Sequence, residues 1–138
     1  MATNDERRFG RDLLLPSTAD GTILTTTTGD LVDVTGIENL KKAQINRAIT
    51  LPGTLVHRPL YGGGLPDAVE EASSPAVRAE LANRIRRNAL RDTRIDEASA
   101  TVTEGTVEDP LDGGTLTVKL GLRVRGEDTQ GESIEIEV

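Results

Sequence analysis

The residues that could act in catalysis are few, and they form no known catalytic pattern. The single histidine, His57, lies beside Arg58, and the chain contains no cysteine. A Cys-His pair is therefore excluded, and a Ser-His-Asp arrangement would need a nucleophile-elbow motif that the sequence lacks. We interpret His57 as a loop residue without a catalytic role.

Paired carboxylates are the remaining route to catalysis. Asp67, Glu70 and Glu71 precede the second predicted helix, and glycoside hydrolysis needs two acids roughly 5–9.5 Å apart. A general acid also needs an apolar pocket that raises its pKa, and the chain has one Phe, one Tyr and no Trp to build one. Acidic residues before a helix more often complement its dipole. A peptidoglycan-cleaving enzyme that uses Glu70 or Glu71 is thus an alternative, and we predict a non-enzymatic protein.

Sites for metals and phosphates are also poorly supported. Asp30 and Asp33 do not form a cluster of carboxylates at ligand spacing. The run Gly62-Gly63-Gly64 has the glycines of a phosphate-binding loop, but no Lys-Ser/Thr follows it. We interpret this run as a flexible bend. The sequence predicts no metal and no cofactor.

Charge is distributed unevenly along the chain. The formal net charge is −7, which disfavours nucleic acid as a partner. Arg84, Arg87 and Arg91 are spaced to form a stripe on one flank of a helix, and Arg94 follows. The end of the chain is acidic, through Glu127, Asp128, Glu132, Glu135 and Glu137. These patches indicate either a solvated surface with internal ion pairs or complementary surfaces for partners.

The elements that position these residues fit one small domain. A chain of 138 residues is of ordinary domain length. We predict an N-terminal arm over residues 1–12, as an extended lead-in around Phe9, and a single domain over residues 13–138 with an aliphatic core. The longest apolar run is Leu13 to Leu15, far too short for a membrane span, and the N-terminus lacks the apolar segment of a signal peptide.

Residue patterns predict two strands and then two helices. Residues 22–28 and 31–34 are rich in β-branched side chains and flank Gly29-Asp30, which favours a short hairpin. Thr35 and Glu38 have the spacing of a capping box, and a helix is predicted over residues 36–50. Ser74-Pro75 is typical of a helix start, and apolar residues then recur every fourth position to about residue 90.

The last third of the sequence predicts an antiparallel sheet. Apolar and polar residues alternate strictly over residues 116–124, a strand whose predicted partner covers residues 98–107. A final strand over residues 132–138 forms the sheet edge. The predicted fold is α+β, with two helices packed on a mostly antiparallel sheet in the order β-β-α-α-β-β-β.

The final strand is the strongest candidate for partner binding. It has no proline or lysine that would blunt a sheet edge, so it could accept a strand from another chain through backbone hydrogen bonds. The predicted interface residues in this strand are Ile134, Glu135, Ile136, Glu137 and Val138, and those at the second helix are Arg84, Arg87, Arg91, Asp92 and Arg94.

Five short segments, in this order and at this spacing, resemble the small baseplate wedge proteins of contractile phage tails. That family includes the sheath-initiator subunits of contractile injection systems, and some of its members carry a lysozyme label. The segments are Phe9 to Leu13, Gly36 to Leu40, Leu51 to Gly53, Pro59 to Gly62 and Arg91 to Ile95.

The resemblance implies a structural role. The family usually carries Glu-Pro-Arg where this chain has Asp92, Thr93 and Arg94. The resemblance implies that Arg94 anchors the subunit in the helical core bundle of the baseplate. It further implies that the C-terminal sheet templates the first sheath ring by strand exchange. The implied partners are wedge, sheath and possible tube or hub proteins, with about six-fold symmetry.

The resemblance also implies where the protein is found. It would be made in the cytoplasm and then built into a tail or injection particle, and no membrane partner is expected. A free-standing cytoplasmic adaptor is a further alternative.

Overall fold

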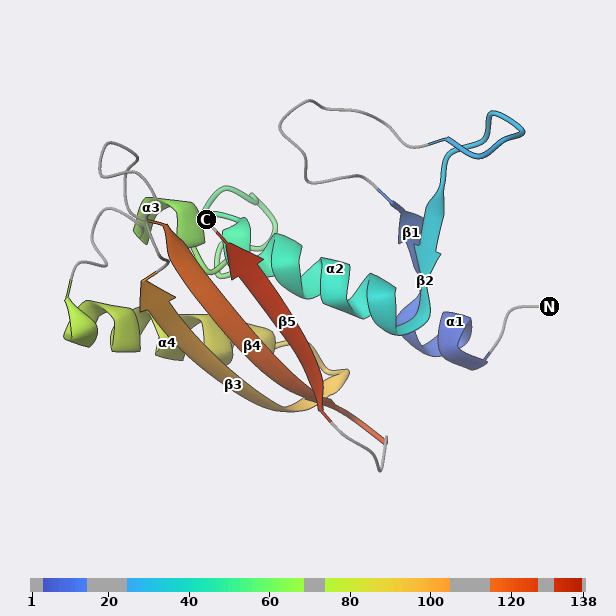
Figure 1. Cartoon of the computed structure of the whole chain (residues 1–138). Helices are drawn as coiled ribbons and strands as arrows, with labels where there is room; N and C mark the ends of the chain where they lie inside the picture. The colour runs from blue at the N-terminus through green and yellow to red at the C-terminus, as the bar shows by residue number, and fades with distance from the viewer. Residues whose placement is uncertain (1–3, 15–24, 69–73, 105–114, 127–130, 138) are drawn as a thin grey trace. The chain divides into compact units, whose positions relative to one another are not determined.

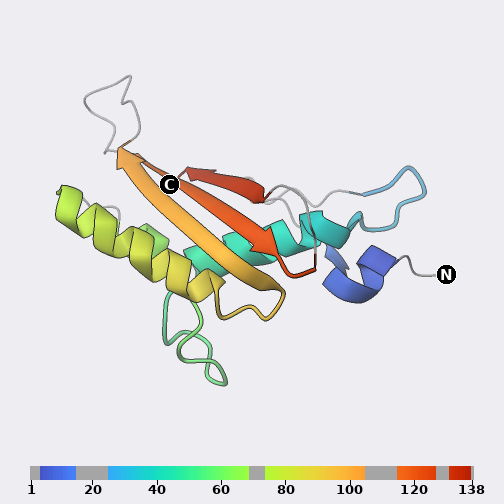
Figure 2. The ribbon, with the colours of Figure 1, turned by 90° about the horizontal axis from the view of Figure 1, so that it is seen from below.

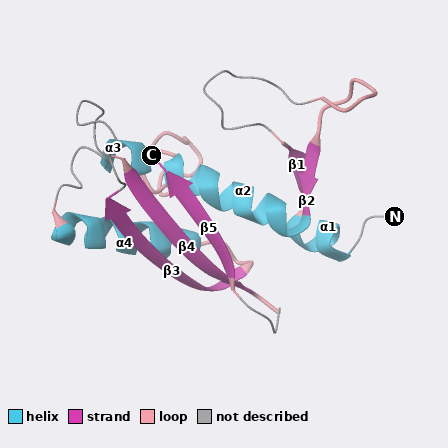
Figure 3. Cartoon of the chain, in the orientation of Figure 1, coloured by secondary structure: helices cyan, strands magenta, loops and turns pink. Residues whose placement is uncertain are grey.

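Helices and antiparallel strands are both present in the computed structural model, which describes residues 4–14, 25–68, 74–104, 115–126 and 131–137 (Figures 1 and 3). The predicted α+β class is therefore confirmed. The chain divides into two compact units, residues 1–43 and 44–138, and the boundary falls inside helix α2 (Gly36–Ile49). Each unit is described by itself below.

The first unit begins with a short helix where the sequence predicted an extended lead-in. Helix α1 (Asn4–Phe9) is followed by strand β1 (Arg11–Leu13). Gly10 ends the helix with a φ of 77°, and its N–H donates to the Glu6 carbonyl at 2.8 Å. Glycine adopts this left-handed conformation without a steric penalty. The six-residue helix is too short to show the periodicity that would reveal it in the sequence.

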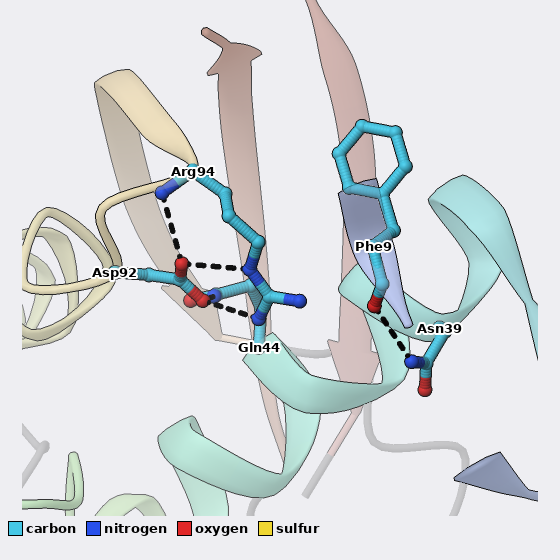
Figure 4. Close-up of polar contacts among 5 residues, drawn as sticks. All are labelled: Phe9, Asn39, Gln44, Asp92 and Arg94. Carbon is cyan, nitrogen blue, oxygen red and sulfur yellow. Dashed lines mark hydrogen bonds and ion pairs between the residues drawn. The ribbon is translucent and has the colours of Figure 1, made fainter. Parts of the chain in front are cut away.

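Phe9 is the apolar anchor of this unit. Its ring is buried, and its carbonyl accepts a hydrogen bond of 2.9 Å from the Asn39 side-chain amide on α2 (Figure 4). Asn39 is itself buried, so this bond satisfies a donor that would otherwise lose its hydration. The contact explains why a single aromatic residue in a polar segment is held in place.

Strand β2 (Asp33–Thr35) pairs with β1, with Leu13 opposite Asp33 and Arg11 opposite Thr35. The sequence predicted instead that this strand would form a hairpin with residues 22–28. A turn does occur, since Thr25 and Leu31 form an antiparallel bridge and Gly29 has a φ of 87°. Residues 22–24 lie outside the described part of the chain.

The second unit is built on a three-stranded antiparallel sheet in the order β3-β4-β5, with β3 (Ile95–Glu104), β4 (Leu116–Val124) and β5 (Glu132–Glu137). In the central strand, Leu120 lies opposite both Ala100 and Ile134. The predicted pairing of the central strand with the segment before it is observed, although β3 begins three residues earlier than the predicted 98–107.

One face of this sheet forms the core of the second unit. The inward side chains of β4 are almost fully buried, and Ile134 and Ile136 of β5 are buried beside them. Helix α4 (Pro75–Ala89) runs along this sheet and packs on β3 (Figure 2). Each such aliphatic side chain contributes roughly 1.5–3 kcal/mol on full burial. The buried residues of β4 are Leu116, Val118, Leu120, Leu122 and Val124.

Local sequence signals account for the helices. The Ser74 hydroxyl accepts a hydrogen bond from the Val77 N–H at 3.3 Å, and Pro75 occupies the first turn. Helix α2 spans Gly36–Ile49 and agrees with its prediction to one residue. A further short helix, α3 (Leu65–Ala68), buries Leu65 and was not predicted. Of the helices in the described ranges, none has the length and hydropathy to cross a membrane.

Candidate functional site

The turn between α4 and β3 holds the most ordered polar cluster of the second unit. Asp92 is buried, with 7% of its side chain exposed. Its carboxylate accepts hydrogen bonds from the Arg94 N–H at 3.1 Å, from Arg94 Nε at 2.9 Å and from Arg94 Nη2 at 2.6 Å (Figure 4). Gln44 Nε2 on α2 donates a fourth bond at 2.9 Å. The cluster fixes the direction in which the chain leaves the helix.

The electrostatics of the cluster favour the ionised pair. Burial by itself would raise the pKa of Asp92, but the hydrogen bonds from Arg94 and the charges of Arg94 and Arg47 outweigh burial and hold it below its ordinary value. The bond to Asp92 in turn raises the pKa of Arg94. This is a structural ion pair, because an acid with a lowered pKa is a poor proton donor at neutral pH.

Gln44 was missed in the sequence, although a signal was present. Leu40 and Ala48 are buried on α2, and Gln44 lies midway between them at a spacing of four residues. A polar residue on the buried stripe of a helix needs a hydrogen-bond partner. Its partner, Asp92, lies 48 positions away in the sequence and could not be identified from the pattern.

The predicted arginine stripe lies on the exposed side of α4. Arg84 and Arg87 are exposed, and Arg91 follows the helix end. Arg91 donates through Nη1 to the Leu60 carbonyl, while Arg87 Nε donates to the Asn83 carbonyl within the helix. Arg91 therefore connects the stripe to the loop before α3, whereas Arg84 and Arg87 are exposed to solvent.

The predicted partner residues of strand β5 differ in exposure. Ile134 and Ile136 have only 6% and 7% of their surface exposed, so their side chains belong to the core of this chain. Glu135 points outward and lies 3.7 Å from Lys119 Nζ. Glu137 pairs with Thr117 along the ladder, and Val138 lies outside the described residues. The edge beyond β5 carries no further strand among the residues that the structure describes.

Of the residues considered for catalysis, Asp67 and His57 lie in the described ranges. Asp67 is exposed, and Glu70 and Glu71 lie outside the described ranges. His57 is exposed in the loop that follows α2. In the described part of the chain, no group of three or more potential metal ligands occurs.

The three glycines of the loop have a packing role and not the flexible role that the sequence suggested. The Gly63 N–H donates to the Arg47 carbonyl at 2.8 Å, and the Gly64 N–H donates to the Thr50 carbonyl at 3.0 Å. A Cβ on Gly63 would lie 2.7 Å from the Ala48 carbonyl oxygen. The loop thus lies directly against the C-terminal end of α2 and satisfies carbonyls that this end leaves open.

Comparison with known proteins finds solved structures with a similar fold. Neither a protein-family profile nor a curated protein sequence matches the chain. One similar structure is a candidate tail lysozyme from Geobacter sulfurreducens, with a TM-score of 0.57 and 19% identity over 85% of this chain and 94% of that chain. Another is a chain of the anti-feeding prophage baseplate, with a TM-score of 0.51 and 21% identity over 74% of this chain and 78% of that chain.

At these identities the likeness establishes a shared fold. The predicted resemblance to tail proteins is confirmed to that extent, since one of these structures is a baseplate and the other is named for a tail. The narrower assignment to the wedge or sheath-initiator family stays a prediction.

Proposed function

We propose that this chain is a non-enzymatic structural subunit of the baseplate of a contractile tail or injection system. The supporting observation is the fold that it shares with a chain of the anti-feeding prophage baseplate. In that setting the subunit joins other baseplate components and becomes part of the assembled particle. The 6-fold symmetry of that baseplate makes a similar copy number the natural expectation.

The contact to the sheath would be made through β5. The strand is a sheet edge with an exposed outward face, and a partner strand could pair with its open side. Because Ile134 and Ile136 stay in the core, recognition would depend on backbone hydrogen bonds and on the outward side chains Ser133 and Glu135. Arg94 directly precedes β3, and 30% of its side chain is exposed. It is the proposed contact to wedge partners.

The test must spare the core, so deletion of β5 is unsuitable. We expect the double substitution Ser133→Lys/Glu135→Lys to leave the chain folded and to abolish assembly of the cognate sheath on purified baseplates, as counted by electron microscopy. Lysine on an edge strand is a known barrier to strand addition. The control is Thr101→Lys/Thr103→Lys, which places two lysines on exposed positions of the other edge strand, β3.

Two outcomes would count against the role of β5. Normal sheath assembly by Ser133→Lys/Glu135→Lys would exclude strand addition at this edge, and equal loss in both variants would indicate a general charge effect. Absence of the chain from purified tail particles would reject the baseplate role itself and favour the adaptor alternative.

A lysozyme-like activity is a second candidate because one structural neighbour is named for it. The pKa evidence in the described residues does not favour it. Hydrogen bonding to Lys42 and to the Leu13 N–H lowers the pKa of Asp12, and the pKa of Asp92 is also lowered, whereas a general acid needs a raised pKa. Clearing of a cell-wall suspension by the chain, lost in Glu70→Gln/Glu71→Gln, would establish the enzyme.

A further inference from the structure

In the described part of the second unit, some arginines form ion pairs with carboxylates and others form none, although the charge of Arg47 still acts on Asp92. On the sheet, Arg123 pairs with Glu97 at 2.5 Å and Arg125 with Asp96 at 2.8 Å. Around the loop that follows α2, the arginines form no ion pair with a described carboxylate. These are Arg47, Arg58 and Arg91, and Arg84 and Arg87 on α4 likewise form none. In a chain of net charge −7, such a local excess of positive charge has to be explained.

Some of these arginines line an open groove of 490 Å³. The Arg47 guanidinium lies over the Tyr61 ring, with 4.5 Å from Cζ to the ring centroid. Arg91 closes one side through its bond to the Leu60 carbonyl. We refer to this feature as the arginine groove. Its lining residues are Arg47, Arg58, Pro59, Leu60, Tyr61 and Arg91.

The walls of the arginine groove are held in place by backbone contacts. The glycine loop bonds to the carbonyls of Arg47 and Thr50, as described above, and the Gly53 N–H donates to the Pro59 carbonyl at 2.9 Å. The stacking of Arg47 on Tyr61 adds a cation–π contact. A surface that is already ordered loses less entropy when it binds a ligand.

Apolar side chains are exposed on the same loop. Leu60 lines the groove with 69% of its surface exposed, and Val56, four residues earlier, is 87% exposed. Exposed large aliphatic side chains next to arginine and tyrosine are typical of protein-binding surfaces, where arginine and tyrosine are enriched among the residues that dominate affinity.

We propose that the arginine groove binds an acidic, amphipathic peptide segment of a partner protein. Carboxylates match the guanidinium groups in charge and in hydrogen-bond geometry. Arg58 and Arg91 are exposed where they line the groove, so a carboxylate can reach them. Apolar residues of the segment cover Leu60. A nucleic acid fits less well, because the overall charge of the chain repels a polyanion. The exposed Leu60 also has no side-chain group that could bind a phosphate.

This inference goes beyond the proposed function, since it concerns a second surface and does not require β5. The probe is a fluorescein-labelled synthetic peptide of glutamate and leucine, titrated with the full chain and followed by fluorescence anisotropy. We expect saturable binding that weakens as salt is added. The same peptide with glutamine in place of glutamate should not bind measurably.

Arg58→Glu is the decisive variant. The Arg58 side chain is exposed, so its replacement leaves the fold intact, and it converts an attraction into a repulsion. We expect the Kd to rise roughly tenfold. The matched control, Arg7→Glu, makes the same change of net charge on an exposed residue of the first unit and should leave the Kd unchanged.

Each other result overturns the proposal. No saturable binding at millimolar peptide, equal binding of the glutamine peptide, or an equal effect of Arg7→Glu and Arg58→Glu would exclude a specific acidic ligand. Tighter binding of an oligothymidine than of the acidic peptide would assign the groove to nucleic acid. The Ser133→Lys/Glu135→Lys variant should bind the peptide with an unchanged Kd. The experiment therefore distinguishes a failure of strand addition at β5 from a failure of peptide binding at the arginine groove.

Discussion

Removal of the Asp92 carboxylate should destabilise the fold through a defined set of lost contacts. Asp92→Ala leaves Arg94 without its ion-pair partner and leaves Gln44 Nε2, which is buried, without an acceptor. Removing one member of a fully buried ion pair costs about 3–5 kcal/mol. Because 30% of the Arg94 side chain is exposed and can be rehydrated, we expect a lower cost of about 2–4 kcal/mol.

Asp92→Asn separates the charge from the hydrogen bonds. In the place of Oδ1, the new amide oxygen can still accept from the Arg94 N–H and Nε, but an NH₂ group in the place of Oδ2 loses the bond from Arg94 Nη2. Its NH₂ group can donate to Gln44 Oε1, which is buried and has no partner in the described structure, once the Gln44 amide turns over. We therefore expect a loss of only about 1–2 kcal/mol for Asp92→Asn.

The measurement is urea unfolding followed by circular dichroism, with the free energy of unfolding taken at constant m value. The control is Asp96→Asn, which removes one partner of the exposed pair with Arg125 and should cost less than about 1 kcal/mol. The reasoning is refuted if Asp92→Ala is no more destabilising than Asp96→Asn, or if Asp92→Asn costs more than Asp92→Ala.

The same carboxylate predicts a pH dependence. The pKa of Asp92 in the folded chain lies below its ordinary value of 3.8. The stabilisation from its charge is therefore fully present above that ordinary value and is lost as the pH falls through the lower folded pKa. We expect the difference in unfolding free energy between the wild type and Asp92→Asn to narrow progressively below pH 3.8. A difference that grows with acidity would contradict this assignment.

Three further substitutions test other parts of the structure. Gly63→Ala should cost about 1–3 kcal/mol of unfolding free energy, because its Cβ would meet the Ala48 carbonyl oxygen at 2.7 Å; an unchanged stability would show that the loop is not pressed against α2. Ile134→Ala should cost about 2–4 kcal/mol, since only 6% of Ile134 is exposed, and a cost near zero would mean that β5 is not part of the core. Glu135→Lys on the outward face should change stability by less than about 1 kcal/mol, and a larger loss would contradict its exposed position.

The second unit could be predicted largely from the sequence. Helix α4 follows from Ser74-Pro75 and from Leu81, Ile85 and Ala89, all of which are buried at a spacing of four residues. The central strand follows from its strict alternation. In both elements one face is buried along the whole length. Apolar residues therefore recur in the sequence with the period of the helix or of the strand.

The contacts between distant segments required the tertiary structure. The sequence could not show that β2 pairs with β1, that Gln44 donates to Asp92, or that Arg47 lies over Tyr61. Each of these contacts has several possible partners in the sequence. The folded chain brings one of them within hydrogen-bond or van der Waals distance, and no periodic residue pattern shows which one. The sequence by itself determined the type and extent of α2, α4 and β4, because their residue patterns mark their ends or their buried face. Only packing across the fold decided what the polar side chains contact, because those contacts are single and not repeated.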